Sequence, residues 1–139
     1  MATTGRRAKP KSGWPLSLVG IVQAGFPAPG DELAAQQLSI DDLLISNPAA
    51  TYLMRVTGLS MKNIGIFEGD LIVVDRSKTA KNGDIVVVFI EQGFSLKRLR
   101  RDASGLQLVA EHERMPPIRV ALEDDLAVWG VVTGVVRQL

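Results

Sequence analysis

The chain has 139 residues, of which 46% are hydrophobic and 22% are charged, and its formal net charge at pH 7 is +1. This length suits one domain, and this composition excludes a largely disordered chain. Because the sequence contains no cysteine, it also excludes disulfides, thiolate zinc sites and a cysteine nucleophile.

The N-terminal residues 1–13 carry Arg6, Arg7, Lys9 and Lys11 and no acidic residue. They lack the apolar core of a secretory signal, and no later apolar stretch is long enough to span a bilayer. We therefore expect a cytoplasmic protein without a membrane partner. The basic residues form either a solvated tail or a contact to nucleic acid, and we expect direct DNA binding to be weak at most.

An apolar segment, residues 16–22, predicts a strand, and it leads into the small and kinked residues 24–30. Two prolines and two glycines favour an extended, unpaired backbone in the kinked segment. Two short helices are expected next, the first beginning near Asp31. The second has Ser39 as its N-cap, with Asp42 three residues later. Its expected buried stripe consists of Ile40, Leu43 and Leu44.

From Thr51 onward, short β segments are separated by glycine-containing turns. Their even spacing without long intervening helices predicts a mostly β domain with short helices, and it argues against a parallel βαβ sheet. The expected strands cover residues 51–56, 71–74, 84–90, 94–100, 106–110 and 128–136.

Ser60 lies in a tight turn, Gly58-Leu59-Ser60-Met61, just before an expected helical turn. In one interpretation the turn presents a nucleophilic hydroxyl at the surface, and the backbone N–H groups of Gly58 and Ser60 hold a developing oxyanion. In the other, Ser60 is the N-cap of the helical turn.

Lys97 is the candidate partner of Ser60. Alternation along the expected strand places Ser95, Lys97 and Leu99 on one face, where Lys97 is partly buried. Burial disfavours the ammonium and lowers the pKa of a lysine, as a general base near neutral pH requires. The pair therefore suggests a Ser/Lys dyad. The alternative is a solvated lysine in a basic cluster with Arg98, Arg100 and Arg101.

The bond between Ala24 and Gly25 is a candidate substrate, because small residues let a backbone enter a narrow cleft and the apolar strand before it can dock by edge pairing. A loop that nothing cuts is the alternative. For the single histidine, His112, an exposed polar loop is favoured over a metal site, which would need carboxylates for nearly all its ligands. We expect no metal and no cofactor.

Motifs in a fixed order, from about Leu18 to Val136, resemble the LexA/UmuD-type self-cleaving serine peptidases. They are Ala24-Gly25-Phe26-Pro27, Gly58-Leu59-Ser60-Met61, Glu68-Gly69-Asp70-Leu71, Gly83-Asp84-Ile85-Val86, Phe94-Ser95-Leu96-Lys97 and Trp129-Gly130-Val131-Val132.

This resemblance implies a β-clip-type peptidase domain with an extended N-terminal arm. It implies Ser60 as nucleophile, neutral Lys97 as general base and self-cleavage between Ala24 and Gly25. The products would be the arm, residues 1–24, and a peptidase and dimerisation domain, residues 25–139.

The resemblance also implies partners in the SOS response. A RecA–single-stranded-DNA filament would stimulate cleavage as coprotease by favouring the cleavable conformation. The shortened product would form a homodimer and join an UmuC-like translesion DNA polymerase in error-prone repair.

Two departures from the family pattern concern the cleavage site and the turn that carries Ser60. Ala24 is the residue typical of LexA repressors at this point, and it is small enough to keep cleavage. Leu59 stands where an acidic residue is often found. Ahead of Gly25 the sequence is too short for a helix-turn-helix domain, so we do not expect a stand-alone repressor.

Two alternative functions remain open on sequence grounds. One is a non-catalytic dimeric interaction module that docks on a DNA polymerase or on RecA. The other is a relative of the signal peptidases, which share Ser/Lys chemistry but normally need a membrane anchor.

Overall fold

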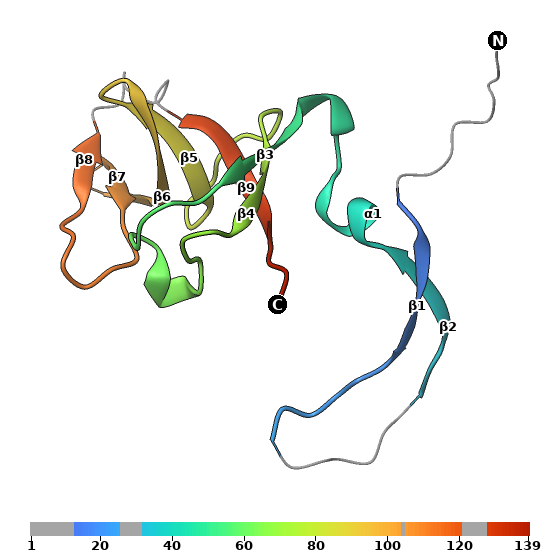
Figure 1. Ribbon diagram of the computed structural model, residues 1–139. Helices are drawn as coiled ribbons and strands as arrows, with labels where there is room; N and C mark the ends of the chain where they lie inside the picture. The colour runs from blue at the N-terminus through green and yellow to red at the C-terminus, as the bar shows by residue number, and fades with distance from the viewer. Residues whose placement is uncertain (1–12, 26–31, 104, 121–127) are drawn as a thin grey trace, which may run out of the picture. The chain divides into compact units, whose positions relative to one another are not determined.

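The computed structural model describes residues 13–25, 32–103, 105–120 and 128–139 (Figure 1). It divides into two units, Met1–Ser46 and Asn47–Leu139. The basic residues between 6 and 11, and residues 26–30 of the kinked segment, lie outside the described residues. Among the described residues, no helix is long and apolar enough to cross a membrane.

The first unit is a β-hairpin followed by a short helix. Strand β1, Pro15–Gly20, pairs antiparallel with β2, Glu32–Ser39, with Leu16 opposite Leu38. The expected first strand is confirmed, but the helix expected near Asp31 is wrong, because this stretch forms β2. Alanine and glutamine give it a helical preference that pairing with β1 overrides.

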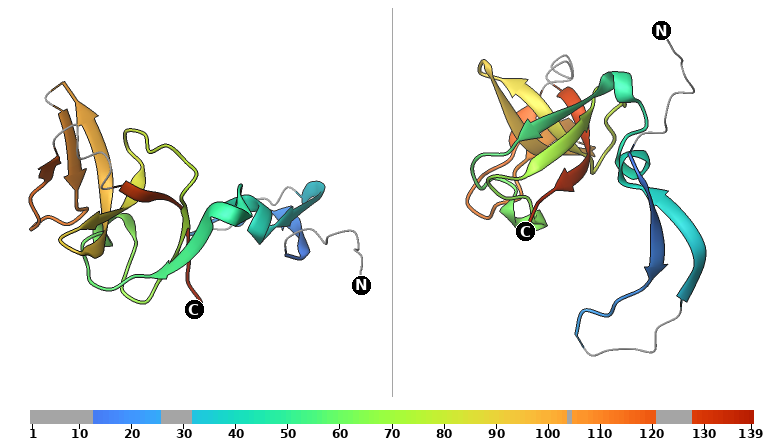
Figure 2. Two further views of the ribbon diagram at one scale, coloured as in Figure 1. Left: turned by 90° about the horizontal axis from the view of Figure 1, so that it is seen from above. Right: turned by 45° about the vertical axis from the view of Figure 1, so that its right-hand side comes forward.

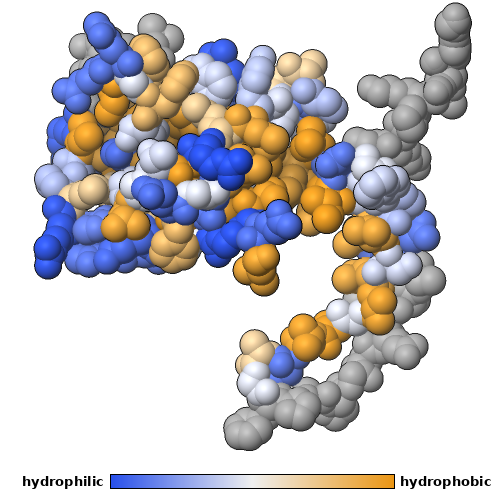
Figure 3. All heavy atoms as spheres, in the orientation of Figure 1, coloured by the Kyte–Doolittle hydropathy of each residue, from blue (hydrophilic) through white to orange (hydrophobic). Residues whose placement is uncertain are grey.

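Helix α1, Ile40–Leu44, confirms the second expected helix and its N-cap, since the Asp42 N–H donates to Ser39 Oγ at 3.5 Å. The expected buried stripe is wrong, because Ile40 is 58% and Leu43 is 69% exposed. A helix of five residues ends before it can lay an apolar face on a neighbouring element. Figure 3 shows apolar side chains on the surface of this unit.

The second unit is a seven-stranded, wholly antiparallel sheet with the strand order β3-β4-β9-β5-β6-β7-β8. The fold is therefore mostly β, as the sequence predicts, and all six strands expected after residue 50 are present. The sheet is strongly twisted (Figure 2). Its strands are β3 Thr51–Arg55, β4 Leu71–Asp75, β5 Ile85–Ile90, β6 Gly93–Asp102, β7 Gly105–Val109, β8 Ile118–Val120 and β9 Val128–Val136. Two 3-10 turns, η1 Pro48–Ala50 and η2 Lys62–Ile64, complete the unit.

Strand β5 is central in this sheet and is buried on both faces. Val86 and Val88 belong to one hydrophobic cluster, whereas Val87 belongs to a second cluster on the other face. This explains its continuous run of apolar residues, which alternation with polar residues would have interrupted. The second cluster also contains Met61, and so it anchors the chain directly after Ser60.

Gly130 in β9 lies against its neighbour strand without room for a side chain. A Cβ atom there would come within 2.6 Å of Val74 Cγ1 and 3.3 Å of the Asp75 backbone oxygen. Val74 is itself fully buried, so it has nowhere to move.

We predict that Gly130→Ala lowers the free energy of unfolding by about 1–3 kcal/mol, as other overpacked sites do. Gly93→Ala is the matched control, because its added Cβ would meet only the Ile90 backbone oxygen at 3.9 Å. Urea unfolding followed by circular dichroism measures both changes. Equal stability of the two variants would contradict the close packing of β9 on β4.

Candidate active site

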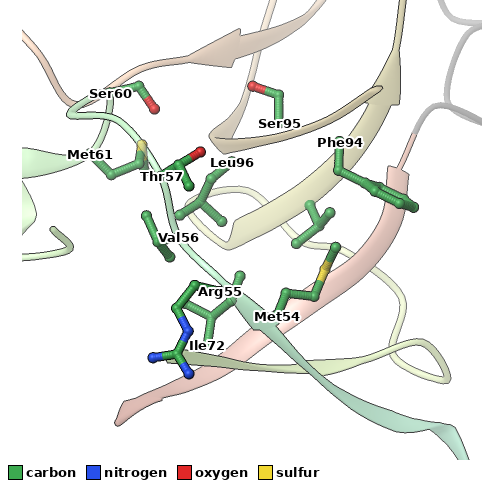
Figure 4. A pocket seen from close by; sticks show the side chains of 11 residues that line it. Met54, Arg55, Val56, Thr57, Ser60, Met61, Ile72, Phe94, Ser95 and Leu96 are labelled. Carbon is green, nitrogen blue, oxygen red and sulfur yellow. The ribbon is translucent and has the colours of Figure 1, made fainter. Parts of the chain in front are cut away.

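A pocket of about 130 Å³ lies beside the turn that carries Ser60 (Figure 4). In Figure 4 the hydroxyl groups of Ser60, Thr57 and Ser95 gather at one end of this pocket, and the apolar side chains of Met54 and Ile72 lie at the other. The full lining consists of Met54, Arg55, Val56, Thr57, Ser60, Met61, Ile72, Val87, Phe94, Ser95 and Leu96. The pocket therefore combines a small apolar space with clustered hydroxyl groups.

Ser60 stands at the start of the helical turn η2 without capping it. The N-cap of η2 is Met61, and no side chain makes a capping hydrogen bond there. The interpretation of Ser60 as a structural N-cap is therefore wrong. Within the described part of the chain, the Ser60 hydroxyl has no hydrogen-bond partner, so it remains available at the pocket.

Lys97 is buried, with 9% of its surface exposed, beside the fully buried Leu99. The expected alternation of β6 is confirmed, and the interpretation of Lys97 as a solvated lysine is wrong. Burial lowers the pKa of Lys97 from its ordinary value, because desolvation penalises the ammonium.

Ser95 connects Lys97 to the pocket, and sequence reasoning did not assign it a role. Lys97 Nζ donates to Ser95 Oγ at 2.6 Å and to the Leu96 backbone oxygen at 3.2 Å. Ser95 and Ser60 line the same pocket, and their hydroxyl groups point toward each other in Figure 4. Among the described residues there is no direct hydrogen bond between Ser60 and Lys97. A signal for Ser95 existed in its position two residues before Lys97 on the same strand face.

The loop of residues 65–70 holds the start of the Ser60 turn. The Gly58 N–H donates to Glu68 Oε1 at 2.9 Å, and the Gly69 N–H donates to the Val56 oxygen at 2.8 Å. Gly58 has a φ of +85°, which favours glycine at this position. Since Glu68 already accepts from the Gly58 N–H, this group is not free to bind an oxyanion in the structure. The Ser60 N–H, in contrast, has no hydrogen-bond partner among the residues that the structure describes.

Asp70 at the end of this loop is buried and pairs with Arg137. Arg137 Nε donates to Asp70 Oδ1 at 2.7 Å and Nη2 donates to Asp70 Oδ2 at 2.6 Å. These bonds, followed by one from the Phe67 N–H, lower the pKa of Asp70 from 3.8 to about 2. The pair attaches the loop to the C-terminal end of the chain.

The basic cluster expected around Lys97 divides into paired and exposed members. Arg98 Nε donates to Glu111 Oε1 at 2.9 Å, whereas Arg100 and Arg101 are exposed.

The stretch around His112 is a loop, as expected, in which Glu113 and Arg114 are exposed and Glu111 and His112 are only partly exposed. No group of three or more His, Asp or Glu side chains among the described residues could hold a metal ion.

Ala24 and Gly25 lie in a bend beyond the end of β1, in the first unit. Gly25 has a φ of +129°, a conformation that favours glycine. The bond between them is thus outside any strand and in a segment with exposed neighbours, since Val22 is 93% exposed.

The second unit thus combines an antiparallel sheet, a small pocket that Ser60 lines, and a buried lysine bonded to another lining residue, Ser95. The chain belongs to the peptidase S24-like family, whose model matches residues 17–133.

Several relatives are similar over most of this chain. The LexA repressor of Pseudomonas chlororaphis is 39% identical over 135 residues, which cover 96% of this chain and 66% of that protein. The LexA repressor of Bordetella avium is 40% identical over 122 residues, or 88% of this chain and 57% of its own length. Protein ImpA of Salmonella typhimurium is 39% identical over 117 residues, or 84% of this chain and 79% of its own length. The chain thus spans less than two thirds of these LexA repressors.

We predict that Lys97 titrates below the ordinary lysine range, because its burial favours the neutral amine. An NMR titration of the protein with ¹³C-labelled lysine measures the pKa of each lysine, and Lys97→Arg identifies the Lys97 signal. Titration of Lys97 within the ordinary lysine range would contradict its burial.

We predict that the stabilising contribution of the Asp70 carboxylate depends on pH. Since folding lowers the pKa of Asp70 to about 2, this contribution is complete above the unfolded value near 4 and is lost as the pH falls toward 2. Asp70→Asn should therefore be less stable than the wild type at pH 7, and the difference should narrow between pH 4 and 2. Urea unfolding at several pH values measures the difference in the free energy of unfolding between the two proteins. A difference that stays constant from pH 7 to pH 2 would contradict the prediction.

Proposed function

We propose that the chain is a self-cleaving serine peptidase in which Ser60 attacks the peptide bond between Ala24 and Gly25 and neutral Lys97 takes the serine proton. The observation that carries the proposal is the environment of the Lys97 amine, which is buried and bonded to Ser95 Oγ at 2.6 Å. Ser95 lines the same pocket as Ser60, whose hydroxyl has no partner among the described residues. A buried amine holds its proton weakly enough to serve as a base.

The reaction proceeds in two halves. As Lys97 Nζ accepts the hydroxyl proton, Ser60 Oγ bonds to the Ala24 carbonyl carbon, and the Ser60 N–H binds the oxyanion. The Lys97 ammonium then gives its proton to the Gly25 nitrogen, the peptide bond breaks, and Ala24 remains as an ester on Ser60. A water molecule, deprotonated by Lys97, hydrolyses this ester and frees residues 1–24 from residues 25–139. Gly58 joins the oxyanion site only if its bond to Glu68 opens.

Strand β3 offers a docking edge for the substrate segment. Within the described residues β3 pairs only with β4, so its other edge has unpaired backbone groups. The same strand supplies Met54 and Arg55 to the pocket. An extended segment added to this edge would pass the pocket, whose volume of about 130 Å³ suits a small side chain such as that of Ala24.

We further propose that cleavage belongs to the SOS response of a cytoplasmic, UmuD-like protein. A RecA–single-stranded-DNA filament favours the cleavable conformation, and residues 25–139 form a homodimer that serves an UmuC-like translesion polymerase. Support comes from the motif order in the sequence and from the similarity to LexA repressors and to ImpA.

A second candidate function is a non-catalytic dimeric interaction module. Two observations favour it. Ser60 and Lys97 make no direct hydrogen bond among the described residues. An aromatic cluster also lies on the sheet, in which the partly buried Trp129 joins three exposed rings, those of Tyr52, Phe89 and Phe94. Such clusters are typical of protein contact surfaces.

We predict that the purified chain cuts itself between Ala24 and Gly25 at a rate that rises with pH and then levels off as Lys97 becomes neutral. Ser60→Ala and Lys97→Ala should each lower this rate by about a thousandfold or more, because the members of a catalytic unit fail together. Mass spectrometry of timed samples measures the fragments.

Lys81→Ala is the control, since Lys81 is an exposed lysine outside the pocket. An intact mass at every pH, with RecA filaments present as well, would overturn the peptidase and favour the interaction module.

A further inference from the structure

The loop after β7 contacts η2 and the residue just before it. The Glu111 N–H donates to Met61 Sδ at 3.4 Å, and the Glu111 oxygen accepts from the Asn63 N–H at 3.0 Å. Met61 directly follows Ser60 and is 99% buried, with 1% of its surface exposed. The backbone of Glu111 is thus fixed to the residues that follow the nucleophile.

The side chain of Glu111 makes the opposite connection, to the strand of Lys97. Its Oε1 accepts from Arg98 Nε at 2.9 Å, and the two side chains are only 20% and 23% exposed. Arg98 Nη1 also donates to the Gly83 oxygen at 2.6 Å, which fixes the guanidinium in place. Arg98 is the residue next to Lys97, so one glutamate joins the neighbours of both proposed dyad residues.

The sheet alone controls the distance between Ser60 and Lys97 poorly. Ser60 follows β3, whereas Lys97 lies in β6, and the strands β4, β9 and β5 separate these two in the sheet. Small changes in twist add up across so many strands. Catalytic groups must keep their geometry within about 0.5 Å, and an error of about 1 Å can cost a hundredfold in rate.

We propose that Glu111 and Arg98 form a positioning pair that sets the separation of Ser60 and Lys97. Neither residue lines the pocket, and the inference rests on the proposed function. The pair acts as a direct brace between the nucleophile turn and the strand of the general base, in place of the long path through the sheet.

The test compares the wild type with Glu111→Gln, Arg98→Gln and the double variant, which leaves the net charge unchanged. Arg100→Gln is the matched control, because Arg100 lies on the same strand face two residues away and is exposed. Three quantities are measured: the plateau rate of self-cleavage at high pH, the apparent pKa of the rate, and the folded fraction at the assay temperature.

Each single variant should lower the plateau rate by about ten- to a hundredfold while the protein stays folded. The double variant should be no slower than the slower single variant, because both remove the same contact. The apparent pKa of the cleavage rate should be the same in the double variant and the wild type, since loss of the pair displaces Lys97 without changing its pKa. Arg100→Gln should cleave within about twofold of the wild type.

Double-variant protein that is folded and cleaves at the wild-type plateau rate would overturn the inference alone. A rate loss that matches the loss of folded protein would also overturn it, because the pair would then be merely structural. An uncut wild-type chain would overturn the proposed function, and the inference with it.

Discussion

The burial of the Lys97 amine is the constraint on which the rest of this site depends. A lysine in water is protonated at neutral pH and cannot accept a proton, whereas desolvation in the interior favours the neutral form. The polar contacts to Ser95 and the Leu96 oxygen make this burial tolerable, because they satisfy the hydrogen-bonding capacity of the amine. One of these contacts joins Nζ to Ser95, which lines the same pocket as Ser60. One short stretch of β6 therefore supplies both the burial of the Lys97 amine and the contacts that fix its position.

The turn that carries Ser60 is held from two directions by residues distant in the sequence. On one side, Glu68 accepts a hydrogen bond from the Gly58 N–H, and the Asp70–Arg137 pair fixes the loop of residues 65–70 that contains Glu68. On the other, the Glu111 backbone holds the helical turn that follows Ser60. Edge strands and turns are usually the softer parts of a sheet. These contacts keep the turn in a defined place, and no hydrogen bond within the described part of the chain occupies the Ser60 hydroxyl.

Much of the fold is predictable from local sequence signals. The apolar run of β5, the turn around Gly83 and the alternation of β6 each specify their element, and the partial burial of Lys97 follows from that alternation. Strand β2 is not predictable in this way, because its alanines and glutamines form a strand only when β1 supplies the partner. Strand β8 has three residues and comes directly after two prolines, so its pattern is too short to recognise.

The supports of the site are less visible in the sequence than the site itself. Asp70 and Arg137 are 67 residues apart, and nothing local marks them as a pair. The most direct test of the central claim changes the basicity of the amine at position 97 alone. Because the chain contains no cysteine, a Lys97→Cys variant can be alkylated in urea with bromoethylamine, refolded and assayed. This treatment restores a lysine-like side chain whose sulfur lowers the amine pKa. We predict that the unmodified variant is inactive, and that alkylation restores cleavage with a rate profile shifted to lower pH. Activity before alkylation, or a restored profile without that shift, would contradict Lys97 as the general base.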